Sequence, residues 1–269
     1  MTSWALNFIQ PWTIDQAQGF IVNQGSAFTP ASISGLGAWY DATDASSFTF
    51  STGADVSQWN DKSGNGNNLT QSTGTLQPLR VASGINSMAA VQFRDDGTAK
   101  MVAAVHSASL TWTTAVHSFV VMRRVADLAA SEHVVGLYAA SGTEREWRLL
   151  ILSDDVLQMT ASTNGMAGGL VSVNNATALS LSTNYILEGT ANTVTQLVGS
   201  SVNNATPATA SGFTAHVNSN APFNVGARNG ASDPYAGYVG EIVFYTKSLT
   251  AGERTQVINY LSAKWGIAV

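Results

Sequence analysis

The sequence predicts an all-β protein built as a sandwich or jelly roll, on three observations. Only 11% of its 269 residues are charged, whereas soluble domains average about 25%. Serine, threonine, asparagine and 24 glycines supply the polar surface instead, and these residues are typical of strands and turns rather than helices. Short apolar runs alternate with Gly/Asn turns along most of the chain, which indicates stacked antiparallel strands.

Composition also limits the function. A chain of this length can bury a large core within a single domain. The net charge is −5 and no basic cluster occurs beyond Arg123-Arg124 and the pair Arg145 and Arg148, so we expect no nucleic-acid partner. The lack of cysteine excludes disulfides and thiolate metal sites. We expect neither a signal peptide nor membrane insertion, because no charged leader and no apolar run of about 18 residues is present.

Residues 1–32 are interpreted as an N-terminal arm ahead of a domain that spans residues 33–269. The aromatic residues near the start have helical spacing, but Pro11 breaks a helix there and other residues alternate as in a strand, so both conformations stay open. An arm this apolar needs cover. It either packs on its own domain or docks on a neighbouring subunit, and we favour the second. Four aromatic residues would make that contact: Trp4, Phe8, Trp12 and Phe20.

The apolar runs of the domain read as short strands, which Gly- and Asn-containing turns such as Gly64-Asn65-Gly66 separate. The predicted strands are Ala38–Asp41, Ala89–Phe93, His117–Arg124, Val134–Tyr138, Trp147–Ile151, Val156–Thr160, Gly169–Val173, Tyr185–Thr190, Val194–Val198, Phe223–Gly226 and Val239–Tyr245.

One short helix is predicted near the C-terminal end, over residues 251–264. Thr250 is a good N-cap, and Glu253 three residues later completes a capping box. Gly266 suits the C-terminal cap. Apolar residues recur between the caps at helical spacing: Val257, Ile258, Leu261 and Trp265. The helix should lie over one end of the sandwich.

Two distant segments carry a family signature. The first is residues 37–44, GAWYDATD, followed by residues 58–67, QWNDKSGNGN. The second is residues 240–249, GEIVFYTKSL, followed by the predicted helix and then WGI. Together they resemble the laminin-G-like, concanavalin-A-like jelly roll. The resemblance implies an antiparallel two-sheet sandwich in which the first and last strands pair, and it places Trp39, Trp59 and Trp265 in the core.

This family includes bacterial surface proteins, domains appended to carbohydrate enzymes and many phage virion proteins. An apolar arm before such a domain is similar to phage structural proteins. The resemblance therefore implies a non-enzymatic virion protein, a capsid decoration or a tail or head fibre component. It would be assembled in the host cytoplasm, exposed on the particle and bound to other virion proteins through the arm. We expect a homo-oligomer with weak affinity for cell-surface glycans. A bacterial carbohydrate-binding module is the alternative, and a glycoside hydrolase is a distant third.

Sugar binding would use exposed aromatic rings beside amides and carboxylates. Trp147, Tyr235 and Tyr238 are the candidates, with Trp112 as a further platform. Tyr235 follows Pro234 in a polar loop, which is the most suggestive setting. For each of these rings, packing in the core is the competing interpretation.

No cofactor is expected apart from a calcium ion, which some laminin-G-like domains hold at a sheet rim. Calcium prefers several carboxylate and carbonyl oxygens. Asp61 in the SGNG loop and Glu241 on the last predicted strand are the candidate ligands. We favour a structural role for both residues: aspartate stabilises tight turns such as the SGNG loop, and Glu241 would be a charge at the sheet rim.

Catalytic residues are not expected. Glu144 and Glu146 could share one face of a strand, as the carboxylates of retaining glycosidases do. The third acid and central aspartate of that glycosidase pattern are missing. Arg145 and Arg148 would more simply pair with these glutamates on the surface. The four histidines do not have zinc-site spacing.

Overall fold

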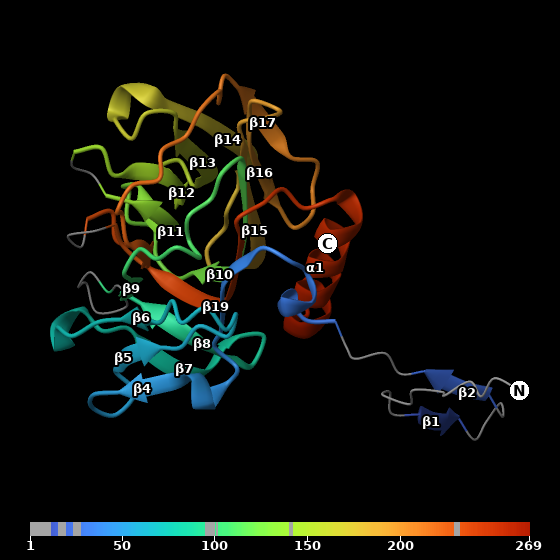
Figure 1. Ribbon diagram of the computed structural model, residues 1–269. Helices are drawn as coiled ribbons and strands as arrows, with labels where there is room; N and C mark the ends of the chain where they lie inside the picture. The colour runs from blue at the N-terminus through green and yellow to red at the C-terminus, as the bar shows by residue number, and fades with distance from the viewer. Residues whose placement is uncertain are drawn as a thin grey trace, which may run out of the picture.

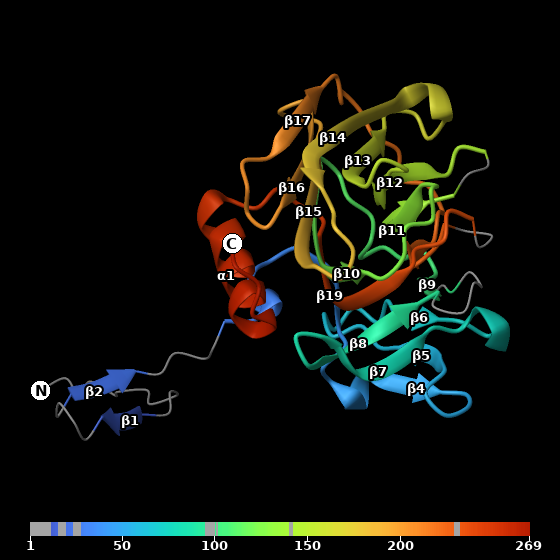
Figure 2. The same cartoon turned by 180° about the vertical axis from the view of Figure 1, so that it is seen from behind.

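Two antiparallel sheets stack face to face, and one α-helix lies beside them (Figures 1 and 2). The computed structural model describes residues 12–15, 20–23, 28–94, 100, 102–139, 142–228 and 232–269. For residues 12–15 and 20–23 it describes only the pairing of two strands. Within this part of the chain the architecture is the predicted all-β jelly-roll sandwich with a short C-terminal helix.

The elements are as follows. The eight-stranded sheet has the order β17 (Ala208–Ser211), β16 (Leu197–Val202), β15 (Asn184–Asn192), β10 (Ala115–Arg124), β19 (Gly237–Tyr245), β8 (Met88–Phe93) and β7 (Leu79–Ile85), with β3 (Leu36–Asp41) also on β19. The nine-stranded sheet has the order β14 (Leu170–Ala178), β13 (Val156–Ser162), β12 (Arg145–Ile151), β11 (Glu132–Tyr138), β18 (Phe223–Val225), β9 (Val102–Ala104), β6 (Leu69–Thr70), β5 (Val56–Trp59) and β4 (Phe48–Phe50). The remaining elements are β1 (Trp12–Asp15), β2 (Phe20–Asn23), η1 (Pro30–Ser32), η2 (Ala45–Ser47), η3 (Gly74–Leu76), η4 (Ala167–Gly169) and α1 (Ala251–Trp265).

The first and last strands of the domain meet as predicted. Trp39 of β3 lies opposite Val243 of β19, and Ala38 lies opposite Phe244. β8 takes the rest of the same edge of β19, from Val239 toward its start. The segments that carry the family resemblance are therefore neighbours in one sheet, although about 200 residues separate them in the sequence.

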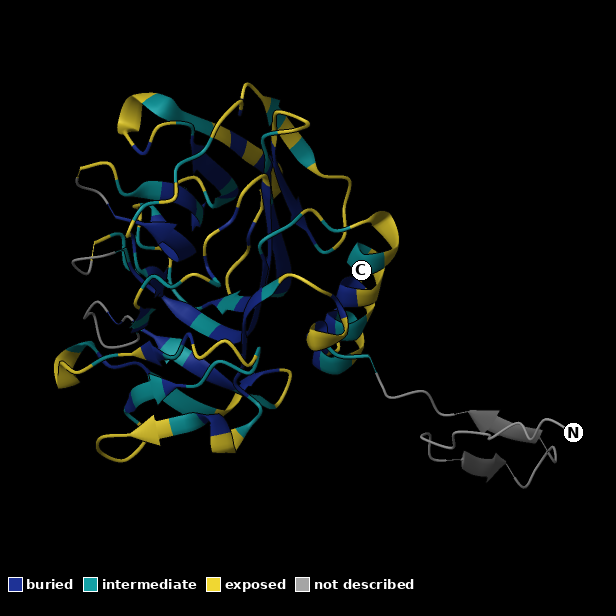
Figure 3. Ribbon diagram, viewed as in Figure 1, coloured by how far each residue is buried: buried dark blue, intermediate teal, exposed yellow. Residues whose placement is uncertain are grey.

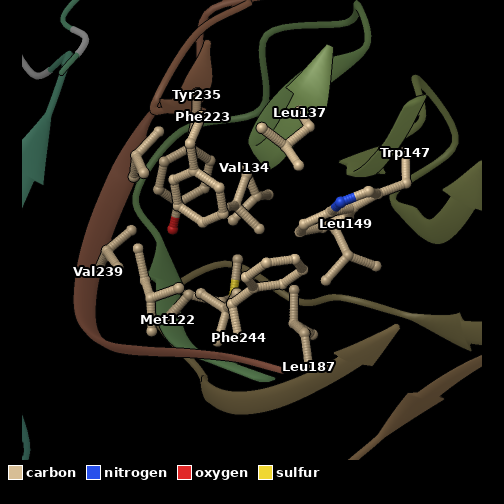
Figure 4. Packing of buried hydrophobic residues seen from close by; sticks show 14 of the residues in the cluster. Met122, Val134, Leu137, Trp147, Leu149, Leu187, Phe223, Tyr235, Val239 and Phe244 are labelled. Carbon is tan, nitrogen blue, oxygen red and sulfur yellow. The ribbon is translucent and has the colours of Figure 1, made fainter. Parts of the chain in front are cut away.

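A single apolar core fills the space between the sheets (Figure 4). Trp147 of the nine-stranded sheet stacks on Phe244 of the eight-stranded sheet, with ring centroids 5.1 Å apart. Phe223 packs against both rings, at 6.1 and 5.7 Å. Such aromatic pairs contribute roughly 0.5–1.5 kcal/mol each beyond the area they bury, so they fasten one layer to the other.

A second apolar cluster lies on the outer face of the eight-stranded sheet. Helix α1 covers it, which corrects the prediction that the helix lies over one end of the sandwich (Figures 1 and 3). β10 and β19 are buried on both faces, so their outer face needs cover. Gly240 fits this contact, because a Cβ there would come within 2.5 Å of the Trp265 ring.

The caps of α1 form as the sequence predicts. The Thr250 hydroxyl accepts from the Glu253 amide at 3.2 Å, and the Glu253 carboxylate accepts from the Thr250 amide at 2.9 Å. Gly266 ends the helix with a φ of 61°, in the left-handed region that favours glycine. The helix is not long and apolar enough to span a membrane, and neither is any other in the described part of the chain.

The predicted arm is described only in part. β1 and β2 pair as antiparallel strands, so Trp12 and Phe20 lie in strands rather than in a helix. Trp4 and Phe8 lie outside the described residues. The end of the arm packs on the domain: the Phe28 ring lies 5.9 Å from that of Tyr260, and the Tyr245 hydroxyl donates to the carbonyl of Pro30 at 2.9 Å. Docking of the earlier residues on a partner stays a prediction.

Candidate ligand site on the nine-stranded sheet

A row of mostly small and polar residues crosses the outer face of the nine-stranded sheet. Each member pairs in register with the next one across the sheet and lies beside a core residue in its own strand. We call these residues the outer row: Thr49, Gln58, Thr70, Ala103, Asn224, Gly136, Arg148, Thr160 and Ser172. Because the period of a strand is two, this face is polar while the opposite face forms the core.

An ion cluster lies at Arg148 in this row. Arg148 and Arg228 each donate to the carboxylate of Asp233, at 3.3 Å in both cases. The Arg148 guanidinium also lies 4.3 Å from the centre of the Tyr138 ring, a cation–π contact. We define the guanidinium site by six residues: His133, Tyr138, Arg148, Asn224, Arg228 and Asp233.

Local structure positions this site. Arg148 lies between Trp147 and Leu149 in β12; both of those residues face the core, so Arg148 must face outward. Its register partner on β11 is Gly136, where a Cβ would come within 2.7 Å of the Arg148 Cα. Asp233 has a φ of 50°, which aspartate tolerates better than most residues, and its carbonyl accepts from the His133 amide at 2.7 Å.

Several polar atoms of the site have no hydrogen-bond partner among the described residues. They are Oδ1 of Asn224 and Nε of Arg148 and Arg228. The ring nitrogens of His133 make no hydrogen bond of normal geometry, although the ring lies close enough to the Asn224 backbone to interact with it. His133 and Asn224 are fully buried. A buried polar atom without a partner costs about 1–3 kcal/mol, so folded proteins keep such groups mainly where water or a ligand completes them.

The electrostatics favour an anion. Burial and the positive charges of Arg148 and Arg228 lower the pKa of His133 to about 3, against an opposing interaction with the Asn224 backbone, so its ring is neutral at pH 7. Burial lowers the pKa of Arg148, with a further contribution from Arg228. Arginine nevertheless remains charged near neutral pH. The site therefore combines two guanidinium groups, which together face one carboxylate of the protein, with an imidazole and an amide oxygen.

Polar side chains continue from the site to the sheet edge at β14. Gln158 donates to Asn174 at 2.7 Å, and the hydroxyls of Thr160 and Ser172 lie 3.0 Å apart. From Asn224 on β18 to Ser172 on β14 the row crosses four strand spacings, which is about 19 Å at about 4.8 Å each. In or beside this row Ser172 and Asn174 are exposed and Arg148 and Gln158 are partly exposed, so a ligand can contact the row through these side chains.

Two of the predicted sugar-binding residues are wrong. Trp147 and Tyr235 are fully buried, and the Tyr235 hydroxyl donates to the carbonyl of Arg123 at 2.8 Å. The competing core interpretation holds for both, and also for Trp112. Tyr238 is partly exposed, and the Arg123 guanidinium lies 4.6 Å from its ring. It belongs to the eight-stranded sheet, whereas the outer row belongs to the nine-stranded sheet. Its role in sugar binding stays a prediction.

The two predicted calcium ligands already bind protein donors. The Asp61 carboxylate accepts from the backbone amides of Trp39, Ser63 and Asn67 at 2.8–3.0 Å, which holds the SGNG loop in place. Glu241 accepts four hydrogen bonds from Trp39, Tyr260, Lys264 and Trp265 at 2.7–2.8 Å. A cation has no free oxygen at Glu241, so this donor set does not fit calcium. In the described ranges no three His, Asp or Glu side chains gather into a metal site.

The two glutamates considered for catalysis do not form an accessible pair. Glu146 is fully buried and accepts from Trp112 Nε1 at 3.0 Å and from the amide of Ser219 at 2.7 Å. Burial raises the pKa of its carboxyl. The predicted pairing of Arg148 with these glutamates is also wrong, because Arg148 binds Asp233.

Sequence reasoning missed most of the guanidinium site. His133 was interpreted as an ordinary strand histidine, and Asn224, Arg228 and Asp233 were not singled out. One signal was available: Arg148 interrupts the apolar run of β12 at the position that faces away from the core.

Comparisons with known proteins support the fold alone. No family model and no curated protein matches the chain. The binding domain of Paraclostridial Mosquitocidal Protein 1 has a TM-score of 0.59 at 15% identity, over 80% of this chain and 52% of that chain. Trypanosoma rangeli sialidase in complex with sialic acid has a TM-score of 0.57 at 13% identity, over 92% and 35%. The binding domain of Botulinum Neurotoxin DC in complex with SialylT has a TM-score of 0.53 at 11% identity, over 87% and 52%. The chain spans about half the length of the toxin chains and about a third of the sialidase chain.

Proposed function

We propose that this chain is a non-enzymatic, lectin-like glycan-binding protein, and that the residues before Phe28 attach it to a larger particle, as a phage virion protein. The observation that carries the glycan-binding role is the outer row with the guanidinium site in it. It gathers amides, hydroxyls and two arginines on one sheet face, and several of their buried atoms lack partners.

Sugars suit such a surface because they present many hydroxyl groups that both donate and accept hydrogen bonds. The guanidinium group of Arg148, whose side chain is 14% exposed, can donate to such hydroxyls. The neighbouring side chains of Gln158, Thr160 and Asn174 extend the polar contact along the row.

The similar structures support a binding role. Two of them are binding domains of toxins, and the neurotoxin domain is in complex with SialylT. The sialidase in complex with sialic acid shares the fold over only 35% of its own chain. The burial of Glu146 argues in the same direction, because the glutamate considered for glycoside hydrolysis is occupied by Trp112 and Ser219.

The test of glycan binding is a glycan array followed by titration calorimetry of each hit, with the full chain. Arg148→Gln should weaken binding at least tenfold, because it removes a guanidinium from the outer row. The matched control is Arg123→Gln. Arg123 also stacks on a tyrosine, Tyr238, but lies on the eight-stranded sheet.

The control makes the location of the site falsifiable. Unchanged affinity in Arg123→Gln with loss in Arg148→Gln supports the outer row. The reverse result places binding at Tyr238 and overturns the proposed site. A blank array at high protein concentration overturns glycan binding altogether.

Attachment to a particle is tested by deletion. Phe28 and Pro30 contact Tyr260 and Tyr245, so the truncation should remove residues 1–27 and keep Phe28. We expect the truncated protein to melt like the full chain yet fail to co-sediment with the assembled particle. Unchanged co-sedimentation contradicts the anchoring role. Capsid and tail genes beside this gene would favour the virion over a bacterial carbohydrate-binding module.

A further inference from the structure

We propose that Asp233 is an internal stand-in for the carboxylate of an acidic sugar, which displaces it from Arg148 and Arg228. This inference rests on the proposed glycan-binding function and names the class of ligand. In the free protein, the Asp233 carboxylate would occupy the position that the carboxylate of a uronic or sialic acid takes in the complex. The two carboxylates would therefore compete for the guanidinium site.

The geometry of the pair shows that it is easily exchanged. Both Arg–Asp233 hydrogen bonds measure 3.3 Å, whereas charge-assisted N–H···O bonds are usually about 2.7–2.9 Å. Asp233 is 26% exposed, so water competes for its carboxylate. Elsewhere in the same protein, Arg124 holds Glu132 and Asp155 at 2.6 Å. The two arginines of the guanidinium site therefore bind Asp233 more loosely than Arg124 binds its two carboxylates.

The donors of the site exceed what Asp233 uses. Nε of Arg148 and Nε of Arg228 are buried without a partner among the described residues, although arginine binds carboxylates best through two parallel N–H groups. The Arg148 and Arg228 side chains are 14% and 21% exposed beside Asp233, so a ligand carboxylate can bind both guanidinium groups once the Asp233 side chain moves away. Sugar hydroxyls beside that carboxylate can reach the neighbouring polar side chains of the outer row.

The charge balance points to an anion rather than a neutral sugar. With Asp233 displaced, two guanidinium groups remain beside the buried ring of His133, and that ring stays neutral at pH 7. A neutral glycan that displaced Asp233 would leave these two charges without a counterion in a partly buried place, which is costly. A ligand carboxylate restores the balance.

The experiment compares acidic oligosaccharides with their methyl esters, which differ only in the masked carboxylate. The probes are sialyllactose, oligogalacturonides and hyaluronan fragments, each titrated by calorimetry into the full chain. Asp233→Asn removes the competing charge and keeps a residue that tolerates a φ of 50°. The matched control is Asp155→Asn: Asp155 also pairs with an arginine and has a φ of 67°, but it lies outside the guanidinium site.

We expect at least one acidic probe to bind tenfold or more tightly than its ester. Asp233→Asn should tighten that acidic probe threefold or more and leave the ester unchanged. Asp155→Asn should change neither affinity, and Arg148→Gln should remove the preference for the acid. Melting curves confirm that each variant is folded.

Other results overturn the inference. Equal affinity for acid and ester, with binding still lost in Arg148→Gln, rejects the acidic ligand but leaves glycan binding standing. Weaker binding of the acid by Asp233→Asn shows that Asp233 contacts the ligand instead of standing in for it. Failure of every probe and of the glycan array rejects the proposed function together with the inference.

Discussion

Two groups of buried polar side chains, one on each outer face of the sandwich, differ in how completely they are hydrogen-bonded. On the eight-stranded sheet, under α1, Glu241 accepts four hydrogen bonds and Glu188 accepts from His117 and Arg254 at 2.6–2.7 Å. On the nine-stranded sheet, His133 and Asn224 are as deeply buried, yet the ring nitrogens make no hydrogen bond of normal geometry and the amide oxygen has no partner among the described residues. Burial alone therefore does not separate structure from function here.

Under the proposed function, the difference separates a region that stabilises the fold from a region that binds a ligand. A satisfied buried carboxylate locks the helix onto the sheet. An unsatisfied polar cluster destabilises the free protein and is kept when a ligand completes it. If this interpretation is right, substitutions on the helix-covered face should reduce stability, whereas substitutions in the guanidinium site should reduce binding.

The largest effect is expected for Glu241→Gln. The carboxylate holds Trp39, Tyr260, Lys264 and Trp265 at once, and breaking one side of a buried ion pair costs about 3–5 kcal/mol. Urea denaturation should show a loss of this size in the free energy of unfolding. Glu144→Gln, the same change at a half-exposed position before β12, should cost less than about 0.5 kcal/mol. Equal losses in the free energy of unfolding for Glu241→Gln and Glu144→Gln would contradict the structural role of the buried carboxylate under α1.

The next effect is a pH dependence that Glu188 contributes. Burial alone would raise its pKa, but the hydrogen bonds from His117 and Arg254 lower it to about 2. The folded carboxylate binds its proton more weakly than the unfolded one, so this stability is present above about pH 4.5 and is lost as the pH falls toward 2. This difference between the folded and unfolded pKa of Glu188 contributes about 3 kcal/mol to the free energy of unfolding at neutral pH. Unfolding measured from pH 5 to 2.5 should flatten in Glu188→Gln, and an unchanged slope would contradict the assignment.

The sequence predicted the parts of the fold that local chemistry determines. The capping box of α1 could be predicted because Thr250 and Glu253 are close together in the sequence. The pairing of β3 with β19 was predicted from the family resemblance. Strands β4, β5, β6, β9 and β17 were missed because runs of two to four residues show no period. The seven-residue strand β7 was missed as well. The predicted strand over residues 194–198 begins only at Leu197, after Gln196 turns the chain with a φ of 58°.

The site was harder to predict than the fold, for a physical reason. Alternation shows that Trp147 and Arg148 face opposite sides of the sheet but not which side is the core, and the aromatic ring was assigned to the surface. Arg148 and Asp233 are 85 positions apart, and only the assembled sheet brings them together. Unpartnered atoms, which mark the site, cannot be seen in a sequence at all.

A smaller effect is expected for Thr250→Ala, which removes the N-cap of the covering helix. The Thr250 hydroxyl accepts from the Glu253 amide at 3.2 Å, and loss of such a cap costs about 1 kcal/mol. A thermal melt should show a decrease in Tm of a few degrees, with glycan affinity unchanged because α1 lies on the other sheet. Thr255→Ala, inside the same helix, serves as the control. A change in glycan affinity would contradict the separation of the two faces.

The smallest change in stability, and the sharpest contrast with Glu241, is expected for His133→Leu. Leucine has a similar volume and adds no polar atom of its own that needs a partner, so the free energy of unfolding at pH 7 should change by less than about 1 kcal/mol or increase. The pH dependence should change more. Burial lowers the pKa of His133 to about 3. Below about pH 6.5 the unfolded chain therefore binds a proton on His133 that the folded chain does not bind. The free energy of unfolding of the wild-type protein should decrease as the pH falls from about 6.5 toward 3. In His133→Leu, denaturation between pH 6.5 and 4.5 should lose that slope, whereas glycan affinity should fall. A loss of several kcal/mol at pH 7, as in Glu241→Gln, would show instead that the imidazole is bonded like the carboxylates under the helix, and the two faces would no longer differ in kind.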